Sequence, residues 1–305
     1  MLQNNEIVYH YCSIDSFKSI IEHNCIRLCD VQKSNDSDER TFFENIMKST
    51  IEYFINHPIA LTSMSLKPNM YYVPLALRTV AEILSGSSSI RAPIYACSFS
   101  MIDDQLSQWR GYADDGYGLS IGFSQHLCRE HFRNHFGAVH YNYEQAVKAS
   151  KLIIRNSLVA CSQHEQEETF KANFILDILR KMEAIGIFYK SNAFSEEKER
   201  RIVMQIDDSI FAATDNSQKY TISRSNNWTD NLSPFTISKR CYRISDKRLS
   251  SYYELNFEKI KNEFICEIIL GPKCRTAEDD LKMFLSDFGY NVSKIRIRQS
   301  TATYR

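Results

Sequence analysis

The sequence has 305 residues, of which 43% are hydrophobic, 24% charged and 12% aromatic, and these fractions exclude a wholly disordered chain. The 37 Lys and Arg residues equal the 37 Asp and Glu residues, so no overall basic field favours nucleic-acid backbones and no overall acidic field favours basic partners. Gly and Pro are scarce, at 9 and 6 residues, which argues against a many-turned β-sandwich.

Nothing in the sequence indicates export or a membrane span. Residues 1–6 lack the basic and apolar regions of a signal peptide, and no stretch approaches about 18 uninterrupted apolar residues. The nine cysteines are odd in number and scattered, as reduced thiols are. The sequence therefore predicts a cytoplasmic protein whose thiols are free, several of them buried.

The first half of the chain is expected to alternate short strands with helices. Strands are expected over 8–11, 26–28, 93–100 and 118–123, and helices after the N-cap Ser13, after the polar turn 34–40 and over 74–84. The stretch 85–89, Ser-Gly-Ser-Ser-Ser, has the composition of a linker.

Glycines are concentrated near the middle of this half. Four of the nine fall within 103–123, namely Gly111, Gly116, Gly118 and Gly122. This concentration predicts that the backbone there turns sharply or approaches another segment closely.

The second half is expected to be helical first and mixed afterwards. Helices are expected over 143–159 and 165–191, a strand over 200–206, and a final β-α-β arrangement over 264–270, 276–288 and 292–297; residues 207–237 are polar and give no clear pattern. Strands and helices follow no βαβ rhythm, so the predicted class is α+β. We expect a single domain over 1–305 with a helical insertion at about 143–192.

Three segments place polar residues next to expected strands, where a rigid edge could present them. They are Tyr9-His10-Tyr11, Ser98-Phe99-Ser100 leading into 106–112, and 195–201 with Glu197 and Glu199. Each also has a purely structural interpretation: a buried structural histidine, turn-forming serines, and a solvated charged face, respectively.

Taken together and in this order, the segments resemble known families. His10, Ser98-x-Ser100 and Glu197-x-Glu199 have the His, Ser-x-Ser, Glu-x-Glu layout of the mono-ADP-ribosyltransferase superfamily. Longer patterns resemble a bacterial family called domain of unknown function 2971; they are His10-Tyr11-Cys12-Ser13, Asn35-Asp36-Ser37-Asp38-Glu39, Ser107-Gln108-Trp109-Arg110-Gly111-Tyr112, Gly118-Leu119-Ser120-Ile121-Gly122-Phe123, Glu197-Lys198-Glu199-Arg200-Arg201 and Glu267-Ile268-Ile269-Leu270-Gly271-Pro272.

The transferase resemblance implies a fold, a substrate and residue roles. The fold would be a set of mixed small sheets forming a central cleft with flanking helices, and the substrate NAD. His10 would bind the adenosine ribose, and Ser98 and Ser100 would support the cleft. Glu199 would stabilise the oxocarbenium-like centre as nicotinamide leaves, and Glu197 would orient or deprotonate the acceptor.

The same resemblance implies a macromolecular acceptor for ADP-ribose, either protein or nucleic acid; the lack of a long apolar stretch predicts no membrane partner. The setting would be a bacterial toxin or an anti-phage defence effector, with a partner or antitoxin protein. Two alternatives stay open: a non-catalytic module of the same fold that senses a nucleotide or a partner, and a metal-dependent nuclease built on Asp36, Asp38, Glu197 and Glu199.

Residues around the expected cleft have alternatives of their own. Tyr11, Trp109 and Tyr112 could stack nicotinamide, although Trp109 is as well explained as a core anchor. Arg110 could clamp a phosphate, since the guanidinium fork suits one, or could pair with Asp114 or Asp115.

No metal is expected. His131 and His135 have the i, i+4 spacing of helical zinc ligands, but no Glu follows His131 and no second ligand cluster occurs.

The transferase hypothesis makes a geometric prediction. His10, Ser98, Ser100 and Glu199 should line one concave pocket. Glu197 and Glu199 should project into it from one strand, where mutual repulsion should raise the pKa of at least one of them.

Overall fold

The computed structural model describes residues 6–33, 39–57, 59–62, 72–86, 93–161, 167–205, 234–245 and 247–304. The chain divides into two compact units. The first, called here the sheet unit, comprises 1–33, 92–138 and 196–305, and the second, the helical unit, comprises 34–91 and 139–195. The predicted α+β class is confirmed, because a mixed sheet and helices share the chain.

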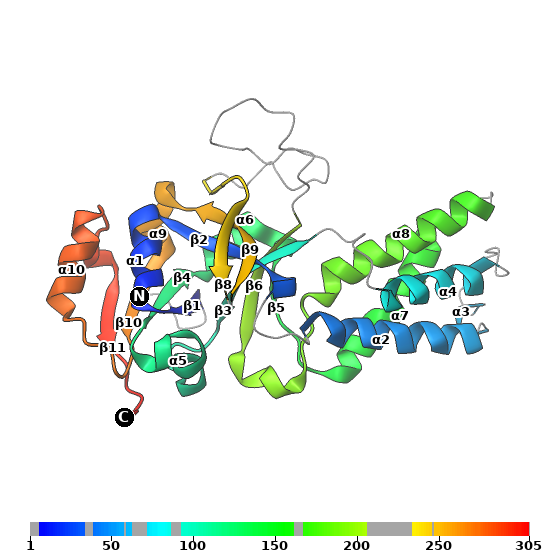
Figure 1. Ribbon diagram of the computed structural model, residues 1–305, viewed down its shortest axis with the longest axis horizontal. Helices are drawn as coiled ribbons and strands as arrows, with labels where there is room; N and C mark the ends of the chain where they lie inside the picture. The colour runs from blue at the N-terminus through cyan, green and yellow to red at the C-terminus, as the bar shows by residue number, and fades with distance from the viewer. Residues whose placement is uncertain are drawn as a thin grey trace. The chain divides into compact units, whose positions relative to one another are not determined.

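The strands described in the sheet unit form one open sheet of eleven strands (Figure 1). Its longest path runs β11-β10-β4-β1-β3-β2-β9-β7, with β5 joined to β6, β6 to β3, and β8 to β9. All pairs are antiparallel except β10 with β11. The strands are β1 (Ile7–Cys12), β2 (Cys25–Asp30), β3 (Ile94–Ser100), β4 (Leu119–Ser124), β5 (Phe136–Ala138), β6 (Glu199–Gln205), β7 (Thr236–Ile237), β8 (Cys241–Ser245), β9 (Arg248–Asn256), β10 (Ile265–Leu270) and β11 (Arg296–Gln299).

The helices of the sheet unit are α1 (Ile14–His23), α5 (Leu106–Tyr112), α6 (Gln125–Phe132), α9 (Lys261–Phe264) and α10 (Glu278–Asp287). As predicted, Ser13 caps α1, and its hydroxyl accepts a hydrogen bond from the amide of Ser16. The final strand lies later than expected, at Arg296–Gln299. Residues Val292–Lys294 form a 3-10 turn instead, because the side chain of Asn291 caps that turn by accepting from the amide of Ser293.

The sheet branches at β3. One edge of β3 pairs with β6 over its whole length. The other edge is shared: Tyr95 and Ala96 pair with β2, and Ser100 pairs with Tyr9 of β1. The expected set of small sheets is therefore one sheet whose two halves diverge from β3.

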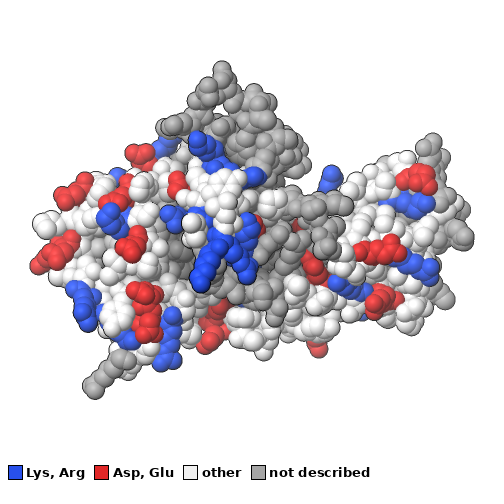
Figure 2. Space-filling view, in the orientation of Figure 1, with Lys and Arg blue, Asp and Glu red and all other residues white. Residues whose placement is uncertain are grey.

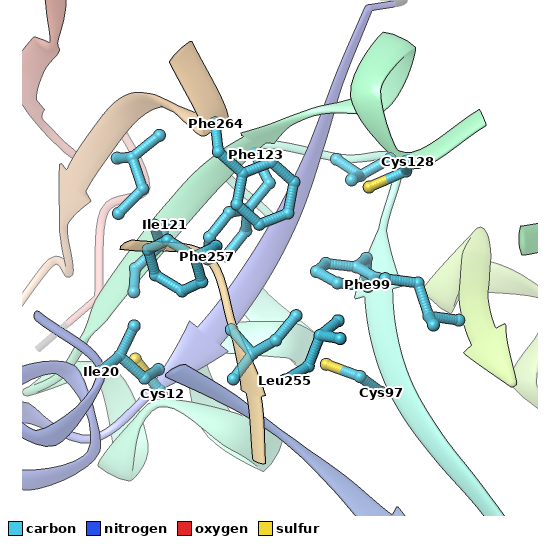
Figure 3. Packing of buried hydrophobic residues seen from close by; sticks show 14 of the residues in the cluster. Cys12, Ile20, Cys97, Phe99, Ile121, Phe123, Cys128, Leu255, Phe257 and Phe264 are labelled. Atoms are coloured by element: carbon cyan, nitrogen blue, oxygen red, sulfur yellow. The ribbon is translucent and has the colours of Figure 1, made fainter. Parts of the chain in front are cut away.

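A hydrophobic core covers the inner face of this sheet (Figure 3). Alternation along β3 turns Cys97 and Phe99 into it, and Phe123 of β4 packs against Phe264 with ring centroids 4.7 Å apart. Fully burying one such ring contributes about 1.5–3 kcal/mol. The core also holds the thiols of Cys12, Cys97 and Cys128, and all nine cysteines are free, as predicted.

The helical unit is built from α2 (Glu39–Asn56), α3 (Ile59–Thr62), α4 (Tyr72–Ser85), α7 (Tyr143–Cys161) and α8 (Glu167–Gly186). Its apolar residues form a separate core that takes side chains from all five helices. The helical insertion expected at about 143–192 is thus part of a larger unit, because α7 and α8 pack with helices from before residue 86. Over the part of the chain that is described, no helix has the length and apolar character to cross a membrane.

Of the four glycines clustered in 103–123, three lie where another segment approaches closely, as the sequence predicts; Gly111 does not. A Cβ on Gly118 would stand 2.1 Å from the carbonyl oxygen of Cys12, and one on Gly271 would stand 2.4 Å from that of Gly116. Gly116 itself has φ +89°, a conformation that suits glycine. The segment 116–118 therefore packs backbone to backbone against β1 and the end of β10.

Gly118→Ala should destabilise the protein by about 3 kcal/mol or more, because the added methyl group meets rigid backbone. Gly111→Ala is the matched control. A Cβ there meets nothing within 4 Å, so a helical alanine should leave stability unchanged or raise it by about 0.5–1 kcal/mol. Urea denaturation of both variants measures the difference, and equal stabilities would contradict the close packing.

Candidate functional site

The predicted site residues lie on three neighbouring strands. His10 belongs to β1, Ser98 and Ser100 to β3, and Glu199 to β6. The register places Tyr9, Ser100 and Glu199 in one row across these strands, and Ser98 lies opposite Arg201. The sheet thus brings together segments that are separated by about ninety residues or more in sequence.

The two faces of the sheet divide these residues. Because directly opposed residues project to the same face, Ser98, Ser100, Glu199 and Arg201 share the outer face. His10 projects from the inner face, where its ring lies 6.0 Å from that of Phe99. His10 and Glu199 therefore project to opposite faces of the sheet and do not line one pocket, which corrects the geometric prediction.

His10 instead occupies the branch of the sheet. Its Nδ1 lies 3.1 Å from the carbonyl oxygen of Ser98, on the edge of β3 between its pairings with β1 and β2. An imidazole nitrogen that contacts a carbonyl oxygen must donate, so Nδ1 carries the proton and Nε2 is left as an acceptor. Burial lowers the pKa of His10, and the contact with Ser98 opposes this only partly, so the ring is neutral near pH 7.

Glu199 is held by a buried arginine. Its Oε1 accepts from Nε of Arg201 at 2.6 Å and its Oε2 from Nη2 at 2.7 Å, and the two residues are only 7% and 2% exposed. This two-point geometry is the strong form of an ion pair. It fixes the orientation of the carboxylate.

Glu197 does not share a strand with Glu199, which corrects the prediction. Lys198 between them has φ +46°, so the extended alternation starts only at Glu199. Glu197 ends the 3-10 segment Asn192–Glu197, and its Oε1 accepts from the hydroxyl of Tyr112 at 2.9 Å. The two carboxylates therefore do not project from one strand: Glu197 extends from a 3-10 segment and Glu199 from the start of β6.

The two serines of β3 differ in role. Ser98 is exposed on the outer face. Ser100 is buried; its hydroxyl donates to the carbonyl oxygen of Glu197 at 2.8 Å and accepts from the amide of Ile102 at 3.0 Å. Ser100 thus ties the end of β3 to the segment before β6, and Ser98 is the serine open to a ligand.

Tyr11 and Trp109 are core residues, which corrects their predicted place in the wall of the site. Trp109 is fully buried, its indole nitrogen donates to Asp104 at 2.7 Å, and its ring lies 4.7 Å from that of Tyr11. The Tyr11 hydroxyl donates to the carbonyl oxygen of Ile102 and accepts from the amide of Gln105. The core-anchor alternative for Trp109 holds, and Tyr112, 48% exposed, is the accessible aromatic among the three.

Arg110 contacts an aromatic ring near the end of the chain. Its guanidinium carbon lies 4.5 Å from the ring centroid of Tyr304. The salt bridge considered for it with Asp115 is made by Lys273 instead, at 2.8 Å. The hydrogen bonds from Lys273 and Tyr304 lower the pKa of Asp115. Arg110 thus lies in a C-terminal cluster, and its predicted phosphate contact stays a prediction.

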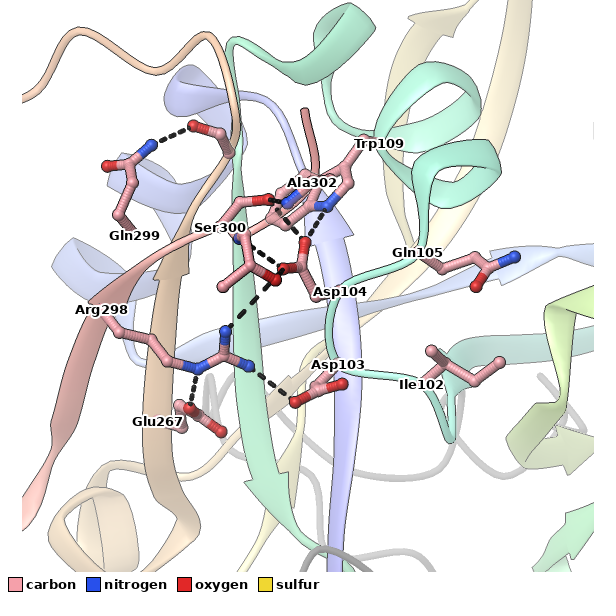
Figure 4. Close-up of polar contacts among 12 residues, drawn as sticks. Ile102, Asp103, Asp104, Gln105, Trp109, Glu267, Arg298, Gln299, Ser300 and Ala302 are labelled. Carbon is pink, nitrogen blue, oxygen red and sulfur yellow. Dashed lines mark hydrogen bonds and ion pairs between the residues drawn. The ribbon is translucent and has the colours of Figure 1, made fainter. Parts of the chain in front are cut away.

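A buried carboxylate that the sequence interpretation left without a role organises the same face (Figure 4). Glu267 of β10 has no exposure and accepts from Tyr9 at 2.9 Å, from Arg296 at 2.7 Å and from Arg298 at 2.8 Å. Arg298 also donates to Asp103 at 2.6 Å. The sequence contained a signal for this site. Glu267 is an acidic residue inside the apolar run 264–270, and two arginines occupy alternate positions of the last strand.

The neighbouring carboxylate of Asp104 extends this network. It accepts from Trp109, from the hydroxyl of Ser300 and from the amide and hydroxyl of Thr301. The loop 102–105 is therefore fastened to β11 and to the start of α5. The position of Tyr112 at the end of α5, and so of its contact with Glu197, depends on these bonds.

The described residues hold no group of three or more His, Cys, Asp or Glu side chains placed to bind a metal ion. Asp36 and Asp38, which the nuclease alternative needs, lie outside the described residues. His131 packs against the ring of Phe235, and burial lowers the pKa of His135 to about 4.

Glu267→Gln should lower the free energy of unfolding by about 3 kcal/mol at pH 7, because it removes the charge that Arg296 and Arg298 neutralise. Burial alone would raise the pKa of Glu267, but the hydrogen bonds from both arginines and Tyr9 outweigh it, and the pKa lies below its ordinary value of 4.5. Its stabilisation is therefore complete above about pH 4.5 and is lost as pH falls through the folded-state pKa.

Urea unfolding of wild type and variant between pH 3 and 7 measures this effect. The difference between them should shrink toward acid pH. Glu278→Gln, on the exposed start of α10, is the matched control and should change stability by less than about 0.5 kcal/mol. A difference that does not depend on pH would contradict the assigned role of the Glu267 charge.

Comparison with known proteins gives one match. Residues 108–202 match the model of a family described as "Protein of unknown function (DUF2971)". No curated protein and no solved structure matches the chain. The matched stretch runs from α5 to β6 and includes Glu197, Glu199 and Arg201. This match supports the predicted relationship with the DUF2971 family.

Proposed function

We propose that the protein cleaves NAD and transfers ADP-ribose to a macromolecular acceptor, with Glu199 at the reacting centre. One observation carries the proposal. The sheet places His10, Ser98-x-Ser100 and Glu199 on the adjacent strands β1, β3 and β6, at the point where the sheet branches. No local sequence effect forces these strands together, so their adjacency supports the proposal, although His10 and Glu199 project to opposite faces.

The proposed chemistry needs an oriented negative charge. The bond between ribose C1′ and the nicotinamide nitrogen breaks, and its electron pair leaves with nicotinamide, while positive charge develops on the ribose. A fixed carboxylate beside that charge lowers the barrier. Arg201 holds both oxygens of the Glu199 carboxylate, and the scheme requires a ribose hydroxyl to reach that carboxylate beside Arg201. Arg201 is a positioning residue in this scheme.

In this scheme Glu197 prepares the acceptor. The acceptor nucleophile forms the new bond to C1′ and gives up its proton, which Glu197 takes. Glu197 is half-buried, so one partner can reach it from solvent, and the Tyr112 hydroxyl fixes one of its oxygens.

His10 and Ser98 supply the proposed contacts with NAD. The neutral imidazole of His10 presents Nε2 as an acceptor for a ribose hydroxyl, because Nδ1 is committed to the Ser98 carbonyl. The exposed hydroxyl of Ser98 projects to the outer face, the face of Glu199, so Ser98 and His10 would contact NAD from opposite faces of the sheet.

A second candidate, a non-catalytic module that senses a nucleotide or a partner, has an observation in its favour. Glu199 is buried together with Arg201, and Tyr11 and Trp109 are used in the core. A binding module needs only the exposed elements, such as Ser98 and Tyr112, whereas catalysis requires access to the Glu199 carboxylate.

Glu199→Gln should lower the rate of nicotinamide release from NAD by about 10²–10³ while leaving NAD affinity nearly unchanged, because it removes one charge that stabilises the transition state. Glu196→Gln, an exposed neighbour, is the matched control and should keep full activity. Chromatographic nicotinamide assays and calorimetric NAD titrations provide the two readouts.

A folded Glu199→Gln protein that turns NAD over at the wild-type rate would remove Glu199 from the reacting centre. A wild-type protein that binds NAD and releases no nicotinamide, also in the presence of cell lysate, would favour the sensing module. Labelled NAD with lysate, followed by separation of protein from nucleic acid, identifies the class of acceptor.

His10→Ala should weaken NAD binding by about 2- to 12-fold, the size expected from one neutral hydrogen bond, and should leave the rate of the bound complex nearly unchanged. His126→Ala, on the exposed side of α6, is the control and should change neither quantity. Loss of folding in His10→Ala without a separable effect on NAD would assign the residue a structural role; His10→Asn then tests the ring in a folded protein.

A further inference from the structure

The β8–β9 hairpin carries a concentration of positive charge that the proposed reaction does not use. The ten residues 239–248 hold five cations and one acid, in a chain whose charges balance overall. Lys239, Arg243, Lys247 and Arg248 are all exposed. Figure 2 shows Lys and Arg side chains gathered over β8 and β9 in the middle of the face drawn.

The register relates this charge to the candidate site. A row of directly opposed residues crosses five strands from β8 to β6: Cys241, Tyr252, Cys29, Ala96 and Val203. All five project to the outer face, which is the face of Ser98, Glu199 and Arg201.

Three arginines project to this outer face by the alternation of their strands. Arg243 is two residues from Cys241, Arg27 two from Cys29, and Arg248 four from Tyr252. The guanidinium of Arg27 lies over the ring of Tyr252, 4.9 Å from its centroid. Positive charge thus extends from β8 across β9 to β2, over two strand spacings or about 10 Å, and Glu254 lies opposite Arg27 on the same face.

The chemistry of this surface favours phosphates. Guanidinium groups bind phosphate oxygens in two-point geometry, and a row of them matches a chain of phosphodiesters better than a single anion. Tyr242 is 57% exposed but projects to the opposite side of β8, which pairs only with β9 among the described strands. A base can stack on it only if a flexible, single-stranded chain passes around that edge.

We propose that the outer face of the β8–β9 hairpin, with Arg243, Arg248 and Arg27, binds the backbone of single-stranded nucleic acid. In this arrangement the bound nucleic acid lies along β9 and β2 and extends toward Ser98 of β3. That the bound nucleic acid is the acceptor of ADP-ribose rests on the proposed function. Binding of nucleic acid to this face does not depend on NAD.

Fluorescence anisotropy with labelled 20-nucleotide DNA and RNA strands, without NAD, tests the binding. The double variant Arg243→Gln/Arg248→Gln should bind at least about tenfold more weakly in 0.1 M salt. Its slope of log affinity against log salt should fall by about 1.4, or 0.7 for each lost phosphate contact. The matched control Arg129→Gln/Arg275→Gln removes two exposed arginines elsewhere in the sheet unit and should bind like wild type.

Several outcomes overturn the inference: wild type that binds neither strand at 50 mM salt, equal loss in both double variants, or tighter binding to duplexes than to single strands. Preferential binding to vesicles rich in anionic lipid, with Ile244→Ser/Leu249→Ser abolishing it, would assign the hairpin to membranes instead. Nucleic-acid binding without NAD cleavage would contradict the proposed function and support this inference. NAD cleavage without nucleic-acid binding would support the proposed function and contradict this inference.

Discussion

The architecture of the sheet unit depends on the burial of one carboxylate. Glu267 has no contact with solvent, and an ionised group in that position would cost several kcal/mol without partners. Arg296 and Arg298 of β11 and Tyr9 of β1 provide them, so the charge is compensated only when these strands are assembled. Asp103 and Asp104 extend the constraint to the loop that begins α5, and through α5 to Tyr112.

Patterns with a local cause were predictable from the sequence. The helix after Ser13 follows from a capping hydroxyl and an apolar stripe, both visible within ten residues. The close backbone approach around Gly118 follows from the concentration of glycines. The α+β class follows from the irregular order of strands and helices. The cap of α1 lies entirely in neighbouring residues, whereas the glycines predicted a close approach without identifying Cys12 as the partner of Gly118.

Features that depend on distant partners were not predictable in the same way. A pair of Glu199 with Lys198 or a neighbouring arginine was one outcome that would count against the transferase hypothesis, but the sequence did not identify Arg201, because only burial selects one of these neighbours. The left-handed Lys198 breaks an alternation that the sequence suggests is continuous. Trp109 looked suitable for stacking, and its role as a core anchor is evident only from Asp104 and Tyr11. The branch at β3 exists because two strands compete for one edge.

The distribution of buried thiols has a practical consequence. Cys12, Cys97 and Cys128 lie in the core of the sheet unit and Cys161 in that of the helical unit. Burial raises the pKa of all four, to about 12 for Cys12, so each stays protonated and unreactive until its own unit opens. Each unit thus carries a native reporter of its opening, and the rates of thiol alkylation resolve whether the two units unfold together or one before the other.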